Sequence, residues 1–252
     1  MAAGHGERGP HRAVLRALQQ SRLRPATVCP TDLDRSGDAG VSAAAADLSD
    51  LTEMDGGARF GASTALVVVD VQNDFTDPAG SLAVSGADAV VAAVNEAVEQ
   101  AVEAGAMVVA TQDWHPESTA HFAKDGGIWP VHCVAATWGA ELHPALTVPA
   151  DARRVRKGQS GEDGYSGFTM RDPVSGDERP TELEAILREH GIRRVVVCGL
   201  ATDYCVKATA LDAVRLGFDT ELLAGAVAAV NLEAGDGERA IAEMAEAGIR
   251  IG

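Results

Sequence analysis

Residues 193–217 read RRVVVCGLATDYCVKATALDAVRLG, and this stretch decides the fold. Residues 193–200 form a largely apolar run, which is typical of a strand buried on both faces of a parallel sheet. Residues 202–217 show helical spacing and end in glycine, a common stop signal for a helix. Thr202 or Asp203 is the candidate N-cap of that helix. A buried strand that leads directly into a helix is the repeating unit of an α/β fold.

The same alternation of strand and helix extends over most of the chain. The sequence predicts strands over 65–70, 107–113, 153–158, 193–200 and 219–225. It predicts helices over 88–105, 181–191, 202–217 and 238–248. We therefore expect the α/β class: a doubly wound, mainly parallel β-sheet with helices on both faces and right-handed crossovers.

The first part of the chain has a different composition. Residues 1–62 are rich in Ala, Gly, Asp, Ser and Arg and lack apolar runs typical of strands. We predict a disordered N-terminal extension over 1–62, followed by one domain over 63–252. Met54 is a candidate for the true start of the protein, and the alternative is a genuine flexible tail.

Charge and cysteine usage limit the classes of partner. The chain of 252 residues carries a formal net charge of −16, so nucleic acid and anionic membrane surfaces are not expected partners. No stretch of 18 apolar residues and no secretory signal is visible. None of the four cysteines forms a C-x-x-C pair, which fits a reducing, cytoplasmic location. The sequence leaves open whether the protein is a monomer or a homo-oligomer.

Polar residues follow several of the predicted strands, and the carboxyl ends of parallel strands meet at one edge where ligands bind. Cys205 opens a helix there, and a helix N-terminus lowers the pKa of a thiol, so it is a candidate nucleophile. Asp70 offers a base, and Lys157 a cation that keeps the base ionised. The alternatives are an inert buried cysteine, a strand-end cap and a surface lysine.

Residues 110–133 hold three of the seven histidines of the chain and two of its three tryptophans. Imidazole and carboxylate ligands suit one divalent ion such as Zn²⁺, Fe²⁺ or Mn²⁺. The candidate ligands are Asp113, His115, His121 and His132. The alternative is a solvated loop with no metal, since short Asp-x-His motifs are common.

Several separate motifs occur in an order that identifies a family. They are VDVQNDF (69–75), AGSLAV (79–84), ATQDWHP (110–116), WPVHC (129–133), VRKG (155–158), YSGF (165–168) and CGLATDYCVKATALDA (198–213). From about residue 64 to the C-terminus, the chain resembles the nicotinamidase/pyrazinamidase branch of the isochorismatase-like cysteine hydrolases. The resemblance covers none of the first 62 residues.

The resemblance implies a role for each candidate residue. It implies a catalytic triad of Asp70, Lys157 and Cys205. It implies an oxyanion hole made by the backbone N–H groups of Ala201 and Cys205, with a cis peptide bond before Ala201. It implies a divalent metal site with the ligands Asp113, His115, His121 and His132. It also implies three aromatic residues around the substrate ring, for which ordinary core packing is the alternative: Phe75, Trp129 and Tyr165.

The implied reaction converts nicotinamide and water to nicotinate and ammonia through a thioester, a step of NAD salvage, with pyrazinamide as a further substrate. One alternative is another small-molecule hydrolase of the same superfamily, although such branches generally lack the full metal set. The other alternative is a non-catalytic binding member. The joint presence of the triad and the four metal ligands favours the nicotinamidase reaction.

Overall fold

A six-stranded parallel sheet organises the protein, whose computed structural model describes residues 58–252. The sheet order is β3-β2-β1-β6-β7-β8, and every neighbouring pair is parallel. Its strands are β1 (Thr64–Val69), β2 (Met107–Asp113), β3 (Arg153–Lys157), β6 (Arg194–Leu200), β7 (Asp219–Ala228) and β8 (Arg250–Ile251). The predicted α/β class with a mainly parallel sheet is confirmed. Residues 1–57, with Met54, lie outside the described part, so the predicted extension stays a prediction.

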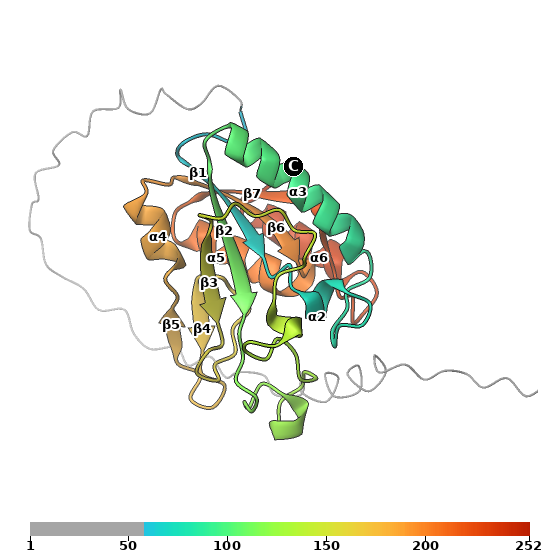
Figure 1. Cartoon of the computed structure of the whole chain (residues 1–252). Coiled ribbons are helices and arrows are strands. Elements are labelled where there is room, and N and C mark those ends of the chain that lie inside the picture. The colour runs from blue at the N-terminus through green and yellow to red at the C-terminus, as the bar shows by residue number, and fades with distance from the viewer. Residues whose placement is uncertain (1–57) are drawn as a thin grey trace, which may run out of the picture. The chain divides into compact units, whose positions relative to one another are not determined.

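Helices cover both faces of this sheet, as expected (Figure 1). One face packs against α3 (Ala87–Glu103). The other face packs against α4 (Leu183–Glu189), α5 (Lys207–Arg215) and α6 (Asp236–Glu246). The central strand β1 contributes to both layers because alternate side chains point to opposite faces. Leu66 and Val68 pack on the α3 side, whereas Val67 and Val69 pack on the other side.

Several short elements had no counterpart in the predicted pattern. They are α2 (Asn73–Thr76), the antiparallel pair β4 (Thr169–Arg171) and β5 (Glu178–Pro180), the edge strand β8, and the 3₁₀ turns η2 (Ala123–Asp125) and η3 (Trp138–Ala140). They hold too few residues to show an apolar period. Strand β7 is three residues longer than predicted because the chain continues beyond an irregularity in its register with β6.

The segment after β6 begins as a π-helix, η4 (Thr202–Val206), before α5 continues it. The predicted N-cap is wrong: Ala201 occupies the N-cap position, and no side chain caps this helix. The Asp203 carboxylate instead accepts the N–H groups of Val230, at 3.0 Å, and Asn231, at 2.9 Å. Asp203 therefore ties the start of this helix to the segment after β7.

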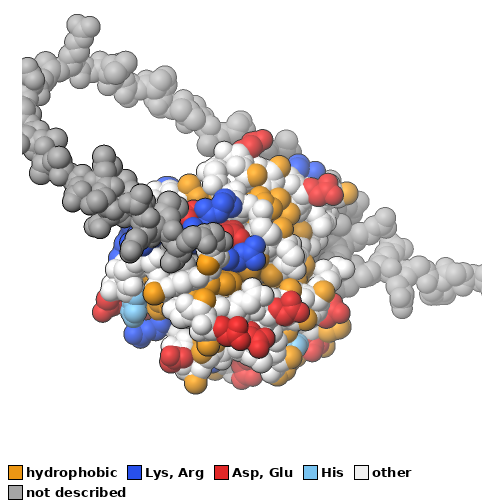
Figure 2. All heavy atoms as spheres, turned by 90° about the horizontal axis from the view of Figure 1, so that it is seen from above, with side chains coloured by type: hydrophobic (Ala, Val, Ile, Leu, Met, Phe, Trp, Pro, Cys, Tyr) orange, Lys and Arg blue, Asp and Glu red, His pale blue; other side chains and the backbone are white. Residues whose placement is uncertain are grey.

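On the face shown in Figure 2, acidic and basic side chains of residues 58–252 are interspersed among apolar ones. Within the same residues, no helix is both long and apolar enough to cross a membrane.

Candidate active site

The predicted site residues converge at the carboxyl ends of four neighbouring strands. Asp70 directly follows β1, and Asp113 and Lys157 end β2 and β3. These last two residues are register partners, so they lie side by side. Cys205 lies in η4, which follows β6. The long segment after β2 lies beyond the tips of these strands (Figure 1). The topology thus gathers residues that are far apart in the sequence at one edge.

Lys157 lies at the centre of the cluster, in contact with two carboxylates and a thiol. Its Nζ lies 2.9 Å from Asp70 Oδ2 and 3.6 Å from Cys205 Sγ, and it also donates to Asp113 Oδ1. Lys157 is 1% exposed and Asp70 is fully buried. A buried ammonium is costly unless it is paired, and here each contact supplies compensation. The alternative of a surface lysine is therefore wrong.

Thr111 holds the carboxylate of Asp70 in place, and sequence reasoning missed it. The Thr111 hydroxyl donates to Asp70 Oδ1 at 2.7 Å, and the Asp70 N–H donates to Thr111 Oγ1 at 3.3 Å. Asp70 has a φ of +49°, a left-handed conformation that neighbours must stabilise in a residue with a side chain. The position of Thr111 two residues before Asp113 was the available signal, because both point to the same face of β2.

Burial, together with the two carboxylates, leaves the resting thiol protonated. Burial raises the pKa of Cys205 well above its usual range, and Asp70 and Asp113 add to this against the opposing effect of Lys157. The sequence led us to expect a lowered thiol pKa from the helix N-terminus, and burial outweighs that effect. A protonated thiol needs a base, and a carboxylate oxygen of Asp70 lies within 4.8 Å of its sulfur. Burial lowers the pKa of Lys157, but the negative charges of Asp113 and Asp70 raise it by more. The pKa therefore lies well above its usual range, and the ammonium stays charged.

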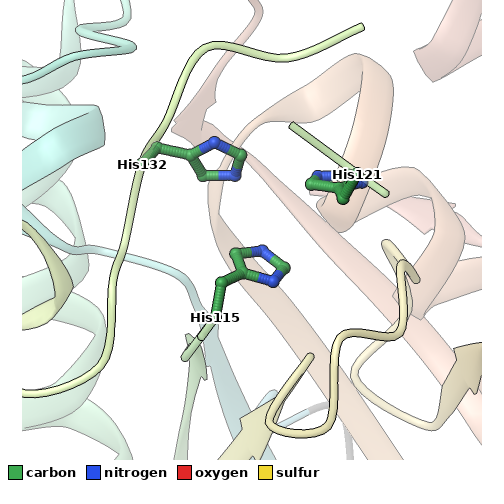
Figure 3. Close-up of side chains that lie close together, drawn as sticks. All are labelled: His115, His121 and His132. Carbon is green, nitrogen blue, oxygen red and sulfur yellow. The ribbon is translucent and has the colours of Figure 1, made fainter. Parts of the chain in front are cut away.

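Beside this cluster, three histidine rings surround one point (Figure 3). Ligand atoms of His115, His121 and His132 all lie within 4.8 Å of one another, and all three residues are buried. Asp113 Oδ2 lies 3.9 Å from His115 Nε2 and 3.8 Å from His132 Nε2. The structure therefore brings together the four residues that the sequence suggested as metal ligands.

The protonation and hydrogen bonding of these rings suit a divalent metal. Burial lowers the pKa of His115 to about 4 and that of His121 to about 3, so both are neutral near pH 7. Both ring nitrogens of His115 are buried without a hydrogen-bond partner among the described residues. His132 Nδ1 donates to the Pro130 carbonyl at 2.8 Å, which leaves its Nε2 free to act as a ligand. Neutral imidazoles with unused lone pairs are the form that binds such an ion.

Aromatic side chains border the two clusters. The Trp129 indole N–H donates to the Tyr165 hydroxyl at 3.1 Å. Tyr204, which sequence reasoning did not assign, packs edge-on against Trp129 with ring centroids 5.1 Å apart, and lies 5.3 Å from the ring of Tyr165. Phe75 lies on another side, with its ring 5.7 Å from that of His132. The position of Tyr204 next to Cys205 was the signal that could have found it.

The sequence profile of the isochorismatase domain matches residues 64–251, which is most of the chain. The chain belongs to the isochorismatase family. Its relatives in that family include a nicotinamidase of Escherichia coli K12, with 38% identity over 203 residues that cover 74% of this chain and 93% of the relative.

Solved structures of isochorismatase-family proteins have the same fold. A pyrazinamidase of Pyrococcus horikoshii in complex with zinc is 44% identical, with a TM-score of 0.68 over 75% of this chain and 98% of that one. An L. infantum protein in complex with nicotinate is 38% identical, with a TM-score of 0.68 over 76% of this chain and 93% of that one.

Two further features of this isochorismatase-family site concern its backbone. The Leu200–Ala201 peptide bond is cis, as the resemblance implied. The oxyanion role of the N–H groups of Ala201 and Cys205 stays a prediction. Gln72, which sequence reasoning missed, exchanges two hydrogen bonds of 2.8 Å with the backbone of Asp113. Gln72 therefore fixes the strand end that carries a candidate metal ligand.

Proposed function

We propose that this isochorismatase-family protein hydrolyses nicotinamide to nicotinate and ammonia, and that it also accepts pyrazinamide. The observation that carries the proposal is the contact of a buried ammonium with Asp70 and Cys205, directly beside the three-histidine cluster. A thiol, a base and a cation suit acyl transfer, and the neighbouring cluster suits a substrate with a heteroaromatic nitrogen. Relatives named nicotinamidase and pyrazinamidase, 38% and 44% identical, support the choice of substrate.

The chemistry would proceed in two halves. Asp70 accepts the proton of Cys205 as the thiolate attacks the carboxamide carbon, and the N–H groups of Ala201 and Cys205 hold the oxyanion. Asp70 then gives that proton to the departing amine, and ammonia and a thioester result. A water that loses its proton to Asp70 cleaves the thioester to nicotinate, and the proton returns to the thiolate. Lys157 remains charged throughout and favours the ionised form of Asp70 before each proton transfer.

The second cluster would fix the substrate. Its metal ligands would be Asp113, His115, His121 and His132. A divalent ion such as Zn²⁺, Fe²⁺ or Mn²⁺ held there would bind the pyridine nitrogen and so orient the ring. Four aromatic side chains would pack around that flat ring, and their faces suit it. They are Phe75, Trp129, Tyr165 and Tyr204.

We expect metal-replete protein to release ammonia from nicotinamide and to lose this activity after treatment with a strong chelator. Benzamide, which lacks the ring nitrogen, is the matched control substrate. Benzamide cannot make the contact between ring nitrogen and metal. Its kcat/KM should therefore be at least about tenfold lower than that of nicotinamide, which corresponds to about 1.4 kcal/mol. Ammonia release and elemental analysis of the same samples measure both effects.

Two outcomes would contradict the proposal. Metal-replete protein that turns over neither nicotinamide nor pyrazinamide would refute the substrate assignment. Full activity of protein shown by elemental analysis to be metal-free would refute the role of the histidine cluster. Adding Zn²⁺, Fe²⁺ or Mn²⁺ separately to chelated protein would then identify the ion that restores turnover.

The pH dependence of kcat/KM should report Asp70. Burial raises the pKa of Asp70 above the usual 3.8, although Lys157 opposes the shift. Asp70 must be ionised to accept the thiol proton, so activity should fall as the pH drops through this raised pKa. The acid limb should therefore have its midpoint above pH 3.8. Metal content measured at each pH separates this limb from loss of the ion, and a midpoint at or below 3.8 would count against Asp70 as the base.

A further inference from the structure

Asp74 holds the backbone next to one of the candidate metal ligands. It lies in α2, and its Oδ2 accepts the N–H of Cys133 at 2.7 Å, while its Oδ1 accepts the N–H of Ser81 at 3.1 Å. The N–H of Cys133 belongs to the peptide unit that joins it to His132. Asp74 therefore fixes the orientation of a peptide plane attached directly to the Cα of His132.

Cys133 also connects this contact to a second histidine. It has a φ of +44°, a conformation that a residue with a side chain keeps only when its surroundings hold it. Its carbonyl accepts the N–H of His115 at 2.9 Å, and the N–H of Ala135 donates to the His115 carbonyl at 2.8 Å. Cys133 thus links the backbones of His115 and His132. Its carbonyl accepts the His115 N–H, and its own N–H, in the peptide unit shared with His132, donates to Asp74.

The surrounding segment is built around the Asp74 carboxylate. A Cβ atom at Gly139 would lie 2.1 Å from Asp74 Oδ2, so only glycine leaves room for this side chain. The side chain of Asn73 donates to the Trp138 carbonyl at 2.7 Å and holds the same segment against α2. Asp74 is not among the described side chains whose ligand atoms gather at the histidine cluster.

We propose that Asp74 is a positioning residue that sets the affinity of the histidine cluster for its divalent ion. It acts through the backbone of Cys133, which orients His132 and His115 toward the common point. This inference rests on the proposed function in one respect, because it takes the cluster as a metal site. Outer groups that orient metal ligands typically change affinity by about 10- to 100-fold when removed.

The test is the dissociation constant for Zn²⁺, measured on metal-free full-length protein by competition with a chromophoric chelator. Asp74→Ala should weaken binding by about 10- to 100-fold. Asp74→Asn should weaken it less, because its single amide oxygen can still accept one of the two N–H groups. Gly139→Ala, which displaces the carboxylate without altering it, should weaken binding in the same direction as Asp74→Ala.

Two matched substitutions serve as controls and should leave the dissociation constant within about twofold of the parent, a change of less than about 0.5 kcal/mol. Asp77→Asn changes a nearby carboxylate that accepts the N–H of Ala79, and Gly225→Ala adds a methyl group where no atom lies within 4 Å. Urea unfolding of the metal-free proteins reports stability separately.

A merely structural role would lower the stability of the Asp74 variants while the folded protein kept its affinity for Zn²⁺. Parent-like affinity in Asp74→Ala, or in Asp74→Asn if the alanine variant does not fold, would overturn the proposal. Ammonia release by the parent protein is measured independently. Absence of turnover together with weaker Zn²⁺ binding in the variants would refute the proposed reaction and leave the role of Asp74 standing.

Discussion

Replacement of Cys205 by alanine should abolish the release of ammonia from nicotinamide, with a fall in kcat of at least about 10⁴-fold. The Cys205 Sγ lies within 4.8 Å of a carboxylate oxygen of Asp70 and 3.6 Å from Lys157 Nζ, so it is the group from which a thioester would form. Without it, only direct attack by water remains. Steady-state ammonia assays with metal-replete protein measure the loss.

Cys198→Ala is the matched control for this substitution. Cys198 is buried as Cys205 is, but it lies within β6 and packs on the α3 face of the sheet. Its loss should cost about 1 kcal/mol of stability and leave kcat nearly unchanged. The Cys205→Ala protein should still bind Zn²⁺, because the histidine cluster does not include the thiol. Retention of more than about 1% of the parental kcat by Cys205→Ala would contradict its role as nucleophile.

Replacement of Lys157 by methionine should destabilise the metal-free protein by about 3–5 kcal/mol and nearly eliminate activity. The ammonium is 1% exposed and contacts both Asp70 and Asp113, so its removal leaves two buried carboxylates without their cation. Lys157 opposes the effect of burial on both carboxyl pKa values, and that of Asp113 is lowered overall. The loss of unfolding free energy caused by Lys157→Met should therefore be largest at neutral pH and become smaller as acid protonates the carboxylates. Urea unfolding at several pH values measures it.

Lys124→Met provides the control for this substitution. Lys124 pairs with Asp125 at 2.7 Å, but its side chain is 45% exposed. Water screens such a pair, so the expected change is below about 1 kcal/mol. Equal losses for the two lysines would mean that the contacts of Lys157 contribute no more than a surface ion pair.

The centre of the sheet was predictable because β1, β2 and β6 are buried on both faces. Residues 65–69, 107–110 and 195–198 are all apolar, and glycines mark the ends of the intervening helices. These signals located β1, β2 and β6, which are three of the four strands at the site edge. The pair β4–β5 and the strand β8 were not predicted, because two or three residues are too few to show an alternation of apolar and polar side chains. The N-cap prediction failed because Asp203 bonds to a distant segment, which no local pattern reveals.

The site was predictable in part for the same reason. Residues at strand ends must meet at one edge, so Asp70, Lys157 and Cys205 followed from topology. Thr111 and Gln72 did not, because their contacts depend on side-chain directions in neighbouring strands. The lowered thiol pKa was also a wrong expectation. The helix N-terminus is visible in the sequence, whereas the burial that raises this pKa depends on tertiary packing.

The order of strands in the sheet has a consequence for how the protein is made. Strand β1 pairs with β2 on one side and with β6 on the other, and β6 begins 125 residues after β1 ends. At about 5–20 residues per second, a ribosome takes roughly 6–25 s to add those residues. Throughout that time the edge of TALVVV that will pair with β6 has no partner strand, and other chains can join this apolar edge. Slower translation between residues 70 and 194 should therefore lower the yield of native enzyme, even though the finished protein is unchanged.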